Sequence, residues 1–185
     1  MIQFSKKRSD SVIEKFVPDM YVKSVYHIDY KDLKKRGIKC IIFDLDNTIA
    51  PINVSKPTKK MKDLIEEIKD LNLRVLIVSN STKKRVEPFK EILNVDSAYF
   101  ARKPYSKKYQ KIMNMYKLKP NQIACVGDQL LTDIYGANKM EFLSILVNPI
   151  GLTDYVLTKF NRLIEPFIYT QLEKKDLLKK GEYYE

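Results

Sequence analysis

The chain has 185 residues, of which 44% are hydrophobic and 31% are charged. This composition is typical of a soluble globular protein with a substantial core. No window approaches the run of about 18–20 apolar residues that a transmembrane helix requires. Lysine and arginine number 34 against 23 acidic residues, a formal net charge of +11. This charge favours an anionic partner and leaves nucleic acid, a membrane surface and a phosphorylated substrate open.

The predicted elements alternate between strands and helices along the chain. The segment up to Gly37 mixes aromatic and basic residues and carries one short helix capped by Asp29. Apolar runs then predict strands at 41–45, 73–78, 97–100, 123–126 and 143–147. Sequences with one apolar face predict helices at 61–71, 82–93, 106–116 and 133–139. From Asp154 onward the pattern is helical, Pro166 divides it into two pieces, and the tail after Gly181 is expected to fray.

This alternation indicates a three-layer α/β fold. Repeated strand–helix–strand units have right-handed crossovers, so the five-stranded sheet is expected to be mainly parallel. The run 41–45 lacks polar alternation and predicts a central strand that is buried on both faces. We expect a single domain over 1–185, with an extension over 1–37, a core over about 38–150 and a helical segment over 151–185.

The two cysteines, Cys40 and Cys125, lie within apolar runs. Thiols in such positions behave as small buried hydrophobic groups, which suits a reducing compartment. The basic residues near the N-terminus are not followed by an apolar stretch, so no signal peptide is predicted. A cytoplasmic protein is expected, with peripheral contact to the inner face of the membrane left open.

Chemically active side chains fall at or just past the ends of four predicted strands. Asp44 and Asp46 end the first strand, and Ser79 follows the second. Lys103 comes shortly after the third strand, and Asp128 follows the fourth. Because ligands bind beyond the carboxyl ends of parallel strands, we expect these side chains to converge. Two neighbouring carboxylates require a cation, and Mg²⁺ fits because it prefers oxygen ligands and leaves room for a phosphate.

These stretches resemble the four motifs of the haloacid dehalogenase (HAD) superfamily of aspartate-nucleophile phosphatases. The resemblance rests on Asp44-Leu45-Asp46-Asn47-Thr48, on Ser79, on Lys103-Pro104 and on Gly127-Asp128 followed by Asp133. More narrowly, 101–104, 127–133 and 158–162 resemble the YqeG type of subclass IIIA, which is similar to the mitochondrial phosphatidylglycerophosphate phosphatases. The resemblance implies a Rossmann-like HAD fold without a cap domain and a phosphoric monoester hydrolase.

The resemblance also implies catalytic roles. Asp44 would attack phosphorus and form an acyl phosphate. Asp46 would protonate the leaving oxygen and then deprotonate the water that cleaves the intermediate. Ser79 and Asn80 would bind phosphoryl oxygens, and Lys103 would neutralise the carboxylates and the transition state.

The implied cofactor is Mg²⁺. Its protein ligands would be Asp44, the backbone carbonyl of Asp46, and Asp128. Asp133 and Thr48 are expected to support these ligands and not to bind the ion directly.

Each motif alone has a simpler interpretation. The acidic motif could begin a calcium loop, but Ile49 stands where the sixth position needs glycine and Ser55 where the twelfth needs glutamate. The serine, lysine and glycine–aspartate motifs could separately be a helix cap, a surface lysine and a turn. Their coincidence at four strand ends favours a phosphatase site. A basic protein that binds RNA or ribosomes is the competing hypothesis, but it leaves the pair Asp44 and Asp46 unexplained.

The short loops leave no room for a cap, which favours a bulky phosphorylated substrate that reaches an open site. Phosphatidylglycerophosphate is the leading substrate because of the resemblance, with nucleotides, nucleic acid ends and phosphoprotein as alternatives. Basic residues predicted at the same edge form either a positive funnel or an ordinary solvated rim: Lys56, Lys59, Lys60, Lys83, Lys84, Arg85, Arg102, Lys107 and Lys108. The apolar stripe of Phe160, Leu163, Ile164, Phe167 and Ile168 either packs on the domain, which is favoured, or contacts a membrane.

Overall fold

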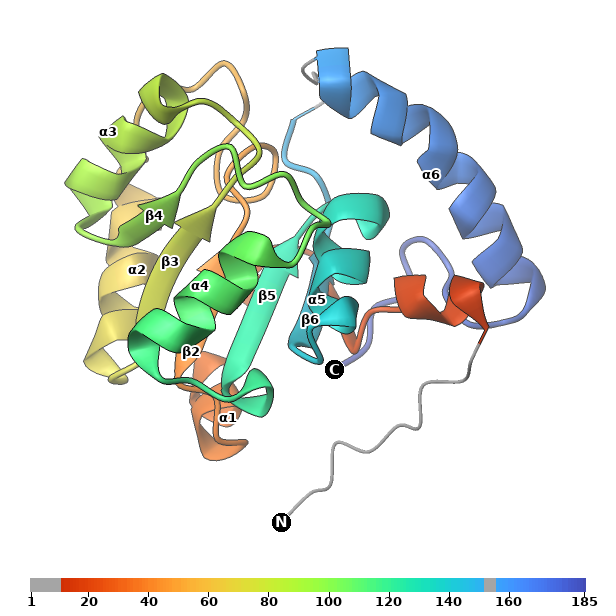
Figure 1. Cartoon of the computed structure of the whole chain (residues 1–185), viewed down its shortest axis with the longest axis horizontal. Coiled ribbons are helices and arrows are strands. Elements are labelled where there is room, and N and C mark those ends of the chain that lie inside the picture. Colours follow the sequence, from red (N-terminus) through yellow and green to blue (C-terminus); the bar gives the residue numbers. More distant parts are fainter. Residues whose placement is uncertain (1–10, 152–155) are drawn as a thin grey trace.

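A computed structural model describes residues 11–151 and 156–185, with the backbone alone for 156–162. Strands and helices alternate along it (Figure 1). In chain order the elements are η1 (Val12–Phe16), β1 (Met20–Val22), η2 (Val25–His27), α1 (Tyr30–Lys35), β2 (Cys40–Phe43), α2 (Lys59–Asp70), β3 (Arg74–Val78), α3 (Lys83–Leu93), β4 (Asp96–Ala98), α4 (Lys107–Tyr116), η3 (Pro120–Gln122), β5 (Ile123–Gly127), η4 (Leu130–Ile134), α5 (Tyr135–Lys139), β6 (Leu143–Val147) and α6 (Val156–Lys174).

The strands form one parallel sheet in the order β1-β6-β5-β2-β3-β4. β2 is central, with Ile41 opposite Ala124 of β5 and Val75 of β3. The predicted α/β class with a parallel sheet is therefore confirmed, but the described sheet has six strands and not five. The additional strand is β1, which has three residues and pairs with β6. Such a short strand carries no periodic pattern that a sequence analysis could recognise.

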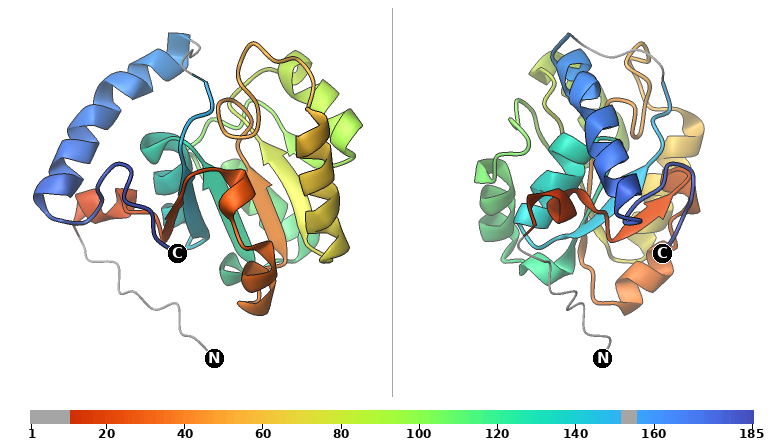
Figure 2. Two further views of the ribbon diagram at one scale, coloured as in Figure 1. Left: turned by 180° about the vertical axis from the view of Figure 1, so that it is seen from behind. Right: turned by 90° about the vertical axis from the view of Figure 1, so that its right-hand side faces the viewer.

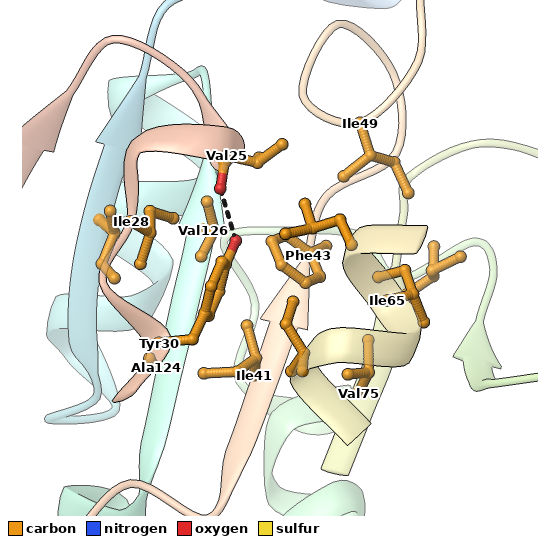
Figure 3. Packing of buried hydrophobic residues seen from close by; sticks show 14 of the residues in the cluster. Val25, Ile28, Tyr30, Ile41, Phe43, Ile49, Ile65, Val75, Ala124 and Val126 are labelled. Carbon is orange, nitrogen blue, oxygen red and sulfur yellow. Dashed lines mark hydrogen bonds between the residues drawn. The ribbon is translucent and has the colours of Figure 1, made fainter. Parts of the chain in front are cut away.

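Alternate side chains of β2 enter two hydrophobic clusters, which explains its uninterrupted apolar sequence. Ile41 and Phe43 join the cluster that is covered by α1, α2 and α3. Figure 3 shows these two side chains between Tyr30 and α2. Cys40 and Ile42 join the opposite cluster, which is covered by α4 and α5. Helices therefore cover both faces of the sheet, as Figures 1 and 2 show.

Local side chains set where the helices begin and end. The side chain of Asp29 accepts a hydrogen bond from the backbone N–H of Asp32 at 2.9 Å and caps α1, as predicted. Gly37 follows this helix with a φ of +93°, a conformation that favours glycine. The hydroxyl of Thr58 accepts from the backbone of Met61 at 3.2 Å and caps α2. The cap fixes the end of the connection between β2 and α2.

One side of α6 packs beside β1 and β6. Ile168 and Leu172 are buried in a cluster with Tyr21 of β1. Leu163 and Phe167 point outward and are 76% and 65% exposed. The predicted apolar stripe thus splits between the core and the surface. Its first member, at position 160, lies outside the residues whose side chains are described.

The predicted break at Pro166 is wrong, because α6 is one helix. A proline inside a helix removes one backbone hydrogen bond and crowds the preceding turn, but a contact beside it holds the segment in place. The buried carboxylate of Glu165 accepts a hydrogen bond from the backbone N–H of Leu130 at 2.6 Å.

Among the described residues, no helix is both long and apolar enough to cross a membrane.

The C-terminal tail docks on the sheet edge, so the expected fraying after Gly181 is wrong. Tyr184 and Tyr21 of β1 exchange two backbone hydrogen bonds, at 2.7 and 2.8 Å. The hydroxyl of Tyr184 donates to the carbonyl of Pro18 at 3.0 Å. Leu178 is buried in the same cluster as α6. The tail thereby pairs with the edge strand and satisfies the backbone groups of Tyr21.

If the tail contributes to stability in this way, Leu178→Ala should destabilise the protein. Loss of a buried leucine side chain costs about 2–5 kcal/mol, and a chain of this length loses about 2–4 °C of Tm per kcal/mol. Thermal denaturation should therefore show a Tm lower by roughly 5–15 °C. Leu163→Ala removes the same atoms from an exposed position and should change Tm by no more than about 2 °C. Equal Tm values for the two variants would contradict the docked tail.

Candidate active site

Four loops at the carboxyl edge of the sheet carry the predicted site residues. Asp44, Ser79 and Asp128 immediately follow β2, β3 and β5, and Lys103 lies between β4 and α4. Asp44, Ser79 and Lys103 line a cavity of about 580 Å³. The chain leaves β2 toward β3 on one side, and β5 lies on the other. Such a switch point is where parallel α/β sheets bind ligands.

The ammonium group of Lys103 bridges two buried carboxylates. Its Nζ donates to Oδ1 of Asp44 and to Oδ1 of Asp133, at 2.6 Å in both cases. Burial alone would lower the pKa of Lys103, but the carboxylates of Asp133 and Asp44 raise it above its ordinary value. Lys103 is therefore a permanent cation within the site.

Asp44 is a buried acid among other acids. Burial raises its pKa from 3.8 to about 7, and the carboxylates of Asp133 and Asp46 add to the effect, although Lys103 opposes it. The effect of burial therefore outweighs the stabilisation that the single lysine gives to the ionised form of Asp44. A further cation would favour the ionised form of Asp44.

The carboxylates of Asp44, Asp128 and Asp133 form an acidic cluster. One oxygen of each lies within 4.8 Å of the others. Thr48 donates its hydroxyl hydrogen to Oδ1 of Asp128 at 3.0 Å and orients that carboxylate. All the donors are oxygen atoms, which hard divalent cations prefer. The cluster and the raised pKa of Asp44 thus fit a divalent metal ion.

Asp133 contacts its neighbours through both carboxylate oxygens. Oδ1 accepts from Lys103, and Oδ2 accepts from the backbone N–H of Gln129 at 3.2 Å. The residue lies inside η4, a π-helical turn that begins at Leu130, so helical structure starts before the predicted position 133. A Cβ atom at Gly127 would lie 2.3 Å from Cγ of Asp133. Glycine at position 127 therefore lets Asp133 reach the lysine.

Asp46 is held by a different set of residues. Its carboxylate accepts hydrogen bonds from the hydroxyl of Ser81 and from Nε of Arg85, the latter at 2.8 Å. The Arg85 side chain is 9% exposed and also donates to the carbonyl oxygens of Pro51, at 3.1 Å, and Val54. Arg85 therefore does not belong to a solvated basic rim. It is a half-buried partner of Asp46.

Asn80 connects two of the loops. Its Oδ1 accepts from the backbone N–H of Lys103 at 2.7 Å, and its Nδ2 donates to the Lys103 carbonyl at 3.3 Å. Ser79 accepts from the backbone N–H of Ser81 at 3.0 Å, so its hydroxyl hydrogen can point to another acceptor. Asn80 therefore fixes the lysine loop, a contact that the sequence does not predict.

Several residues that line the cavity or contact its carboxylates are absent from the predicted catalytic, phosphate-binding and metal-binding residues: Ser81, Arg85, Phe100, Arg102, Gln129 and Thr132. Ser81 and Arg85 contact Asp46. Gln129 and Thr132 line the cavity, and the Thr132 hydroxyl donates to Oε1 of Gln129 at 3.2 Å. Each lies close to a predicted motif, which is the only signal in the sequence. Nothing in the pattern separates them from helix caps or surface residues.

Comparisons with known proteins identify the family. A family model described as mitochondrial PGP phosphatase matches residues 11–151. The probable phosphatase YqeG of Bacillus subtilis is 39% identical over 160 residues, which are 86% of this chain and 93% of the relative. Phosphatidylglycerophosphate phosphatase 1, chloroplastic/mitochondrial, of Arabidopsis thaliana is 24% identical over 171 residues, or 87% of this chain. The chain spans 46% of that longer protein.

Solved structures share the fold at low sequence identity. A putative 3-deoxy-D-manno-octulosonate 8-phosphate phosphatase from Vibrio cholerae has a TM-score of 0.52 and 13% identity, covering 87% of this chain and 98% of that one. An uncharacterized protein from Listeria monocytogenes serotype 4b has a TM-score of 0.51 and 15% identity, covering 74% of this chain and 99% of that one. These likenesses concern the Rossmann-like fold alone. Since the family model covers most of the chain and the Bacillus relative matches over nearly its whole length, the chain belongs to the mitochondrial PGP phosphatase family and is a phosphatase, a phosphoric monoester hydrolase.

Proposed function

We propose that this phosphatase removes the terminal phosphate of phosphatidylglycerophosphate, with Mg²⁺ as its metal and an aspartyl phosphate on Asp44 as its intermediate. The observation that carries the chemistry is the bridge from Lys103 to Asp44 and Asp133 beside the acidic cluster. The lipid substrate is supported by the matching family model and by relatives named phosphatidylglycerophosphate phosphatases.

The residues of the acidic cluster suit Mg²⁺. Asp44 and Asp128 offer carboxylate oxygens, and the backbone carbonyl of Asp46 is the third protein ligand that the HAD resemblance implies. Asp133 already contacts Lys103 and Gln129, which suits a supporting role. When bound, Mg²⁺ would offset the carboxylate charge and that of the phosphoryl oxygens.

Hydrolysis would proceed in two displacements at phosphorus. The carboxylate of Asp44 forms a bond to phosphorus as the bond to the leaving oxygen breaks. Asp46 gives that oxygen a proton and then takes one from the water that attacks the intermediate, so inorganic phosphate leaves and Asp44 is regenerated. Lys103 holds Asp44 in place and neutralises charge that develops in the transition state, while the hydroxyl of Ser79 donates to a phosphoryl oxygen.

The open site supports a substrate with a large body. α2 begins at Lys59, soon after the first motif, and α3 alone connects β3 to β4. Neither connection, from β2 to α2 or from β3 to β4, contains a domain that could close over the cavity. Only the phosphate and the adjoining part of the head group then need to enter, and the rest of a lipid can stay outside.

The substrate is tested by assaying phosphatidylglycerophosphate in mixed micelles beside nucleotides and a soluble aryl phosphate. We expect the lipid to be the best substrate, and Asp44→Asn to lower the release of phosphate from every substrate by at least about 1000-fold, because the nucleophile is gone. Asp63→Asn changes an exposed carboxylate on α2 and serves as the matched control. Activity on nucleotides without activity on the lipid would reject the substrate, and full activity of Asp44→Asn would reject the nucleophile.

Mg²⁺ should stabilise the protein more at pH 8 than at pH 6. The raised pKa of Asp44, about 7 against 3.8, means that its protonation stabilises the metal-free fold fully below pH 3.8 and that this stability is lost as the pH rises through 7. At pH 6 the ion must displace that proton, whereas at pH 8 it binds a carboxylate that is already ionised.

The increase in Tm on adding Mg²⁺ measures this difference. Asp44→Asn removes the titrating ligand and should abolish most of the increase at both pH values. An increase in Tm that is the same at pH 6 and pH 8 in the unaltered protein would contradict the assignment of Asp44 as a ligand.

Arg85→Met should lower kcat by about 10- to 100-fold and leave KM nearly unchanged, because a misdirected Asp46 slows proton transfer without weakening binding. Arg85→Lys keeps the charge but not the planar set of donors, so a smaller loss is expected. The measurement is turnover of a soluble aryl phosphate, with thermal denaturation to verify folding. Lys84→Met, at an exposed position next to Arg85, is the control. An Arg85→Met variant that is folded and fully active would remove Arg85 from the mechanism.

A further inference from the structure

Among the described residues around the cavity, the exposed charged side chains are positive. The described stretches 44–60, 79–84, 99–108, 128–135 and 148–151 form the carboxyl edge of the sheet together with the first turns of its helices. Their acidic residues are the four aspartates of the site, which are buried or, for Asp46, 15% exposed at the side chain. The exposed charged residues of these stretches include Lys56, Lys84, Arg102 and Lys107. The edge that contains the active site is therefore suited to a negatively charged surface.

Large apolar side chains are exposed on the same edge. Phe100, Tyr105 and Ile150 are 54%, 69% and 45% exposed. Phe100 has a φ of +45°, which is rare for a bulky residue, and Arg102 has a φ of +57°. Strained conformations of this kind are frequent at functional sites.

Backbone hydrogen bonds fix these residues in place. The N–H groups of Phe100 and Tyr105 donate to the carbonyls of Ser81 and Arg102, both at 2.9 Å. The N–H of Ile150 donates to the carbonyl of Asn47 at 2.8 Å. The exposed side chains thus project from backbone that is hydrogen-bonded to the loops around the site.

These residues lie on both sides of the cavity. Phe100 and Tyr105 follow β4, whereas Ile150 follows β6, and the sheet order places β3, β2 and β5 between them. Four strand spacings correspond to roughly 19 Å. Asp44, which follows the middle strand β2, lies between the two apolar groups.

We propose that this rim, which consists of Lys84, Phe100, Arg102, Tyr105, Lys107 and Ile150, docks the enzyme on the surface of an anionic lipid bilayer. The proposal rests on the proposed lipid substrate. Aromatic and aliphatic side chains enter the boundary between head groups and acyl chains, and lysine and arginine bind the anionic head groups. The cavity then opens toward the head groups, and the phosphate can enter while the acyl chains remain in the bilayer. Ile150 favours lipid over nucleic acid, because an aliphatic side chain does not stack on bases.

Sedimentation with vesicles tests the docking without any turnover. The full chain should bind phosphatidylglycerol–phosphatidylcholine vesicles, bind pure phosphatidylcholine vesicles much more weakly, and be released from the anionic vesicles by high salt, as the Debye length falls from about 10 Å at 0.1 M to about 3 Å at 1 M. A Lys84→Ser and Lys107→Ser double variant should bind roughly thirtyfold more weakly, at about fivefold per basic residue. A Tyr105→Ser and Ile150→Ser double variant should lose about tenfold, because less apolar surface is buried.

Matched controls lie at the opposite end of the sheet, where the strands begin. Met115, which is 59% exposed near the end of α4, and the exposed Lys117 and Lys119 offer the same kinds of side chain there. Met115→Ser and a Lys117→Ser and Lys119→Ser double variant should bind vesicles as the unaltered protein does. Rim variants that bind normally, or control variants that bind as weakly as the rim variants, would overturn the proposal.

Turnover of a soluble aryl phosphate separates this proposal from the proposed function. The two rim double variants should hydrolyse it at the unaltered rate, since they change neither the cavity lining nor the catalytic residues. An unaltered protein that binds anionic vesicles but hydrolyses neither this ester nor phosphatidylglycerophosphate would retain the docking surface and reject the function. A protein that binds labelled RNA and ignores vesicles at physiological salt would overturn the docking surface.

Discussion

The site depends on one buried ammonium group placed between two carboxylates. Ionised acids in a protein interior are unfavourable unless they are paired. Lys103 pairs with Asp44 and Asp133 at the same time, and Asn80 holds the lysine through two hydrogen bonds to its backbone. The positions of all these groups are therefore coupled. A displacement of Lys103 would leave two buried charges without their common partner, which makes the arrangement strongly favoured once the sheet has formed.

The parallel sheet makes this arrangement possible for residues far apart in the sequence. Asp44 and Asp128 are brought together because they follow β2 and β5, which are hydrogen-bonded parallel neighbours. Each strand is apolar because both of its faces are buried under helices. The polar residue that follows such a strand is the first one that leaves the core. The hydrophobic pattern of the strands thus also sets the positions of Asp44 and Asp128.

The same relation explains which features could be predicted from the sequence. Asp44, Ser79 and Asp128 follow buried runs that are unmistakable, so their convergence could be predicted. The partnership of Arg85 with Asp46 could not, because a basic residue in the first turn of a helix has the same pattern whether it points to solvent or inward. The sequence does not predict β1 or the docked tail, because short backbone pairings such as that of Tyr21 with Tyr184 depend on tertiary packing. The sequence pattern predicts a helix break at Pro166 that does not occur, because contacts such as that of Glu165 with Leu130 hold α6 in place.

The contacts of Arg85 also limit how this enzyme can change during evolution. Its guanidinium group joins the carboxylate of Asp46 to the carbonyls of Pro51 and Val54, which lie in the connection between β2 and α2. An insertion between Pro51 and Val54 would separate these two carbonyls, which are the acceptors that orient the guanidinium group. Evolution of a lid at this position would then require a new means of holding Asp46. The contacts of a single arginine can thus keep an active site open over the course of evolution.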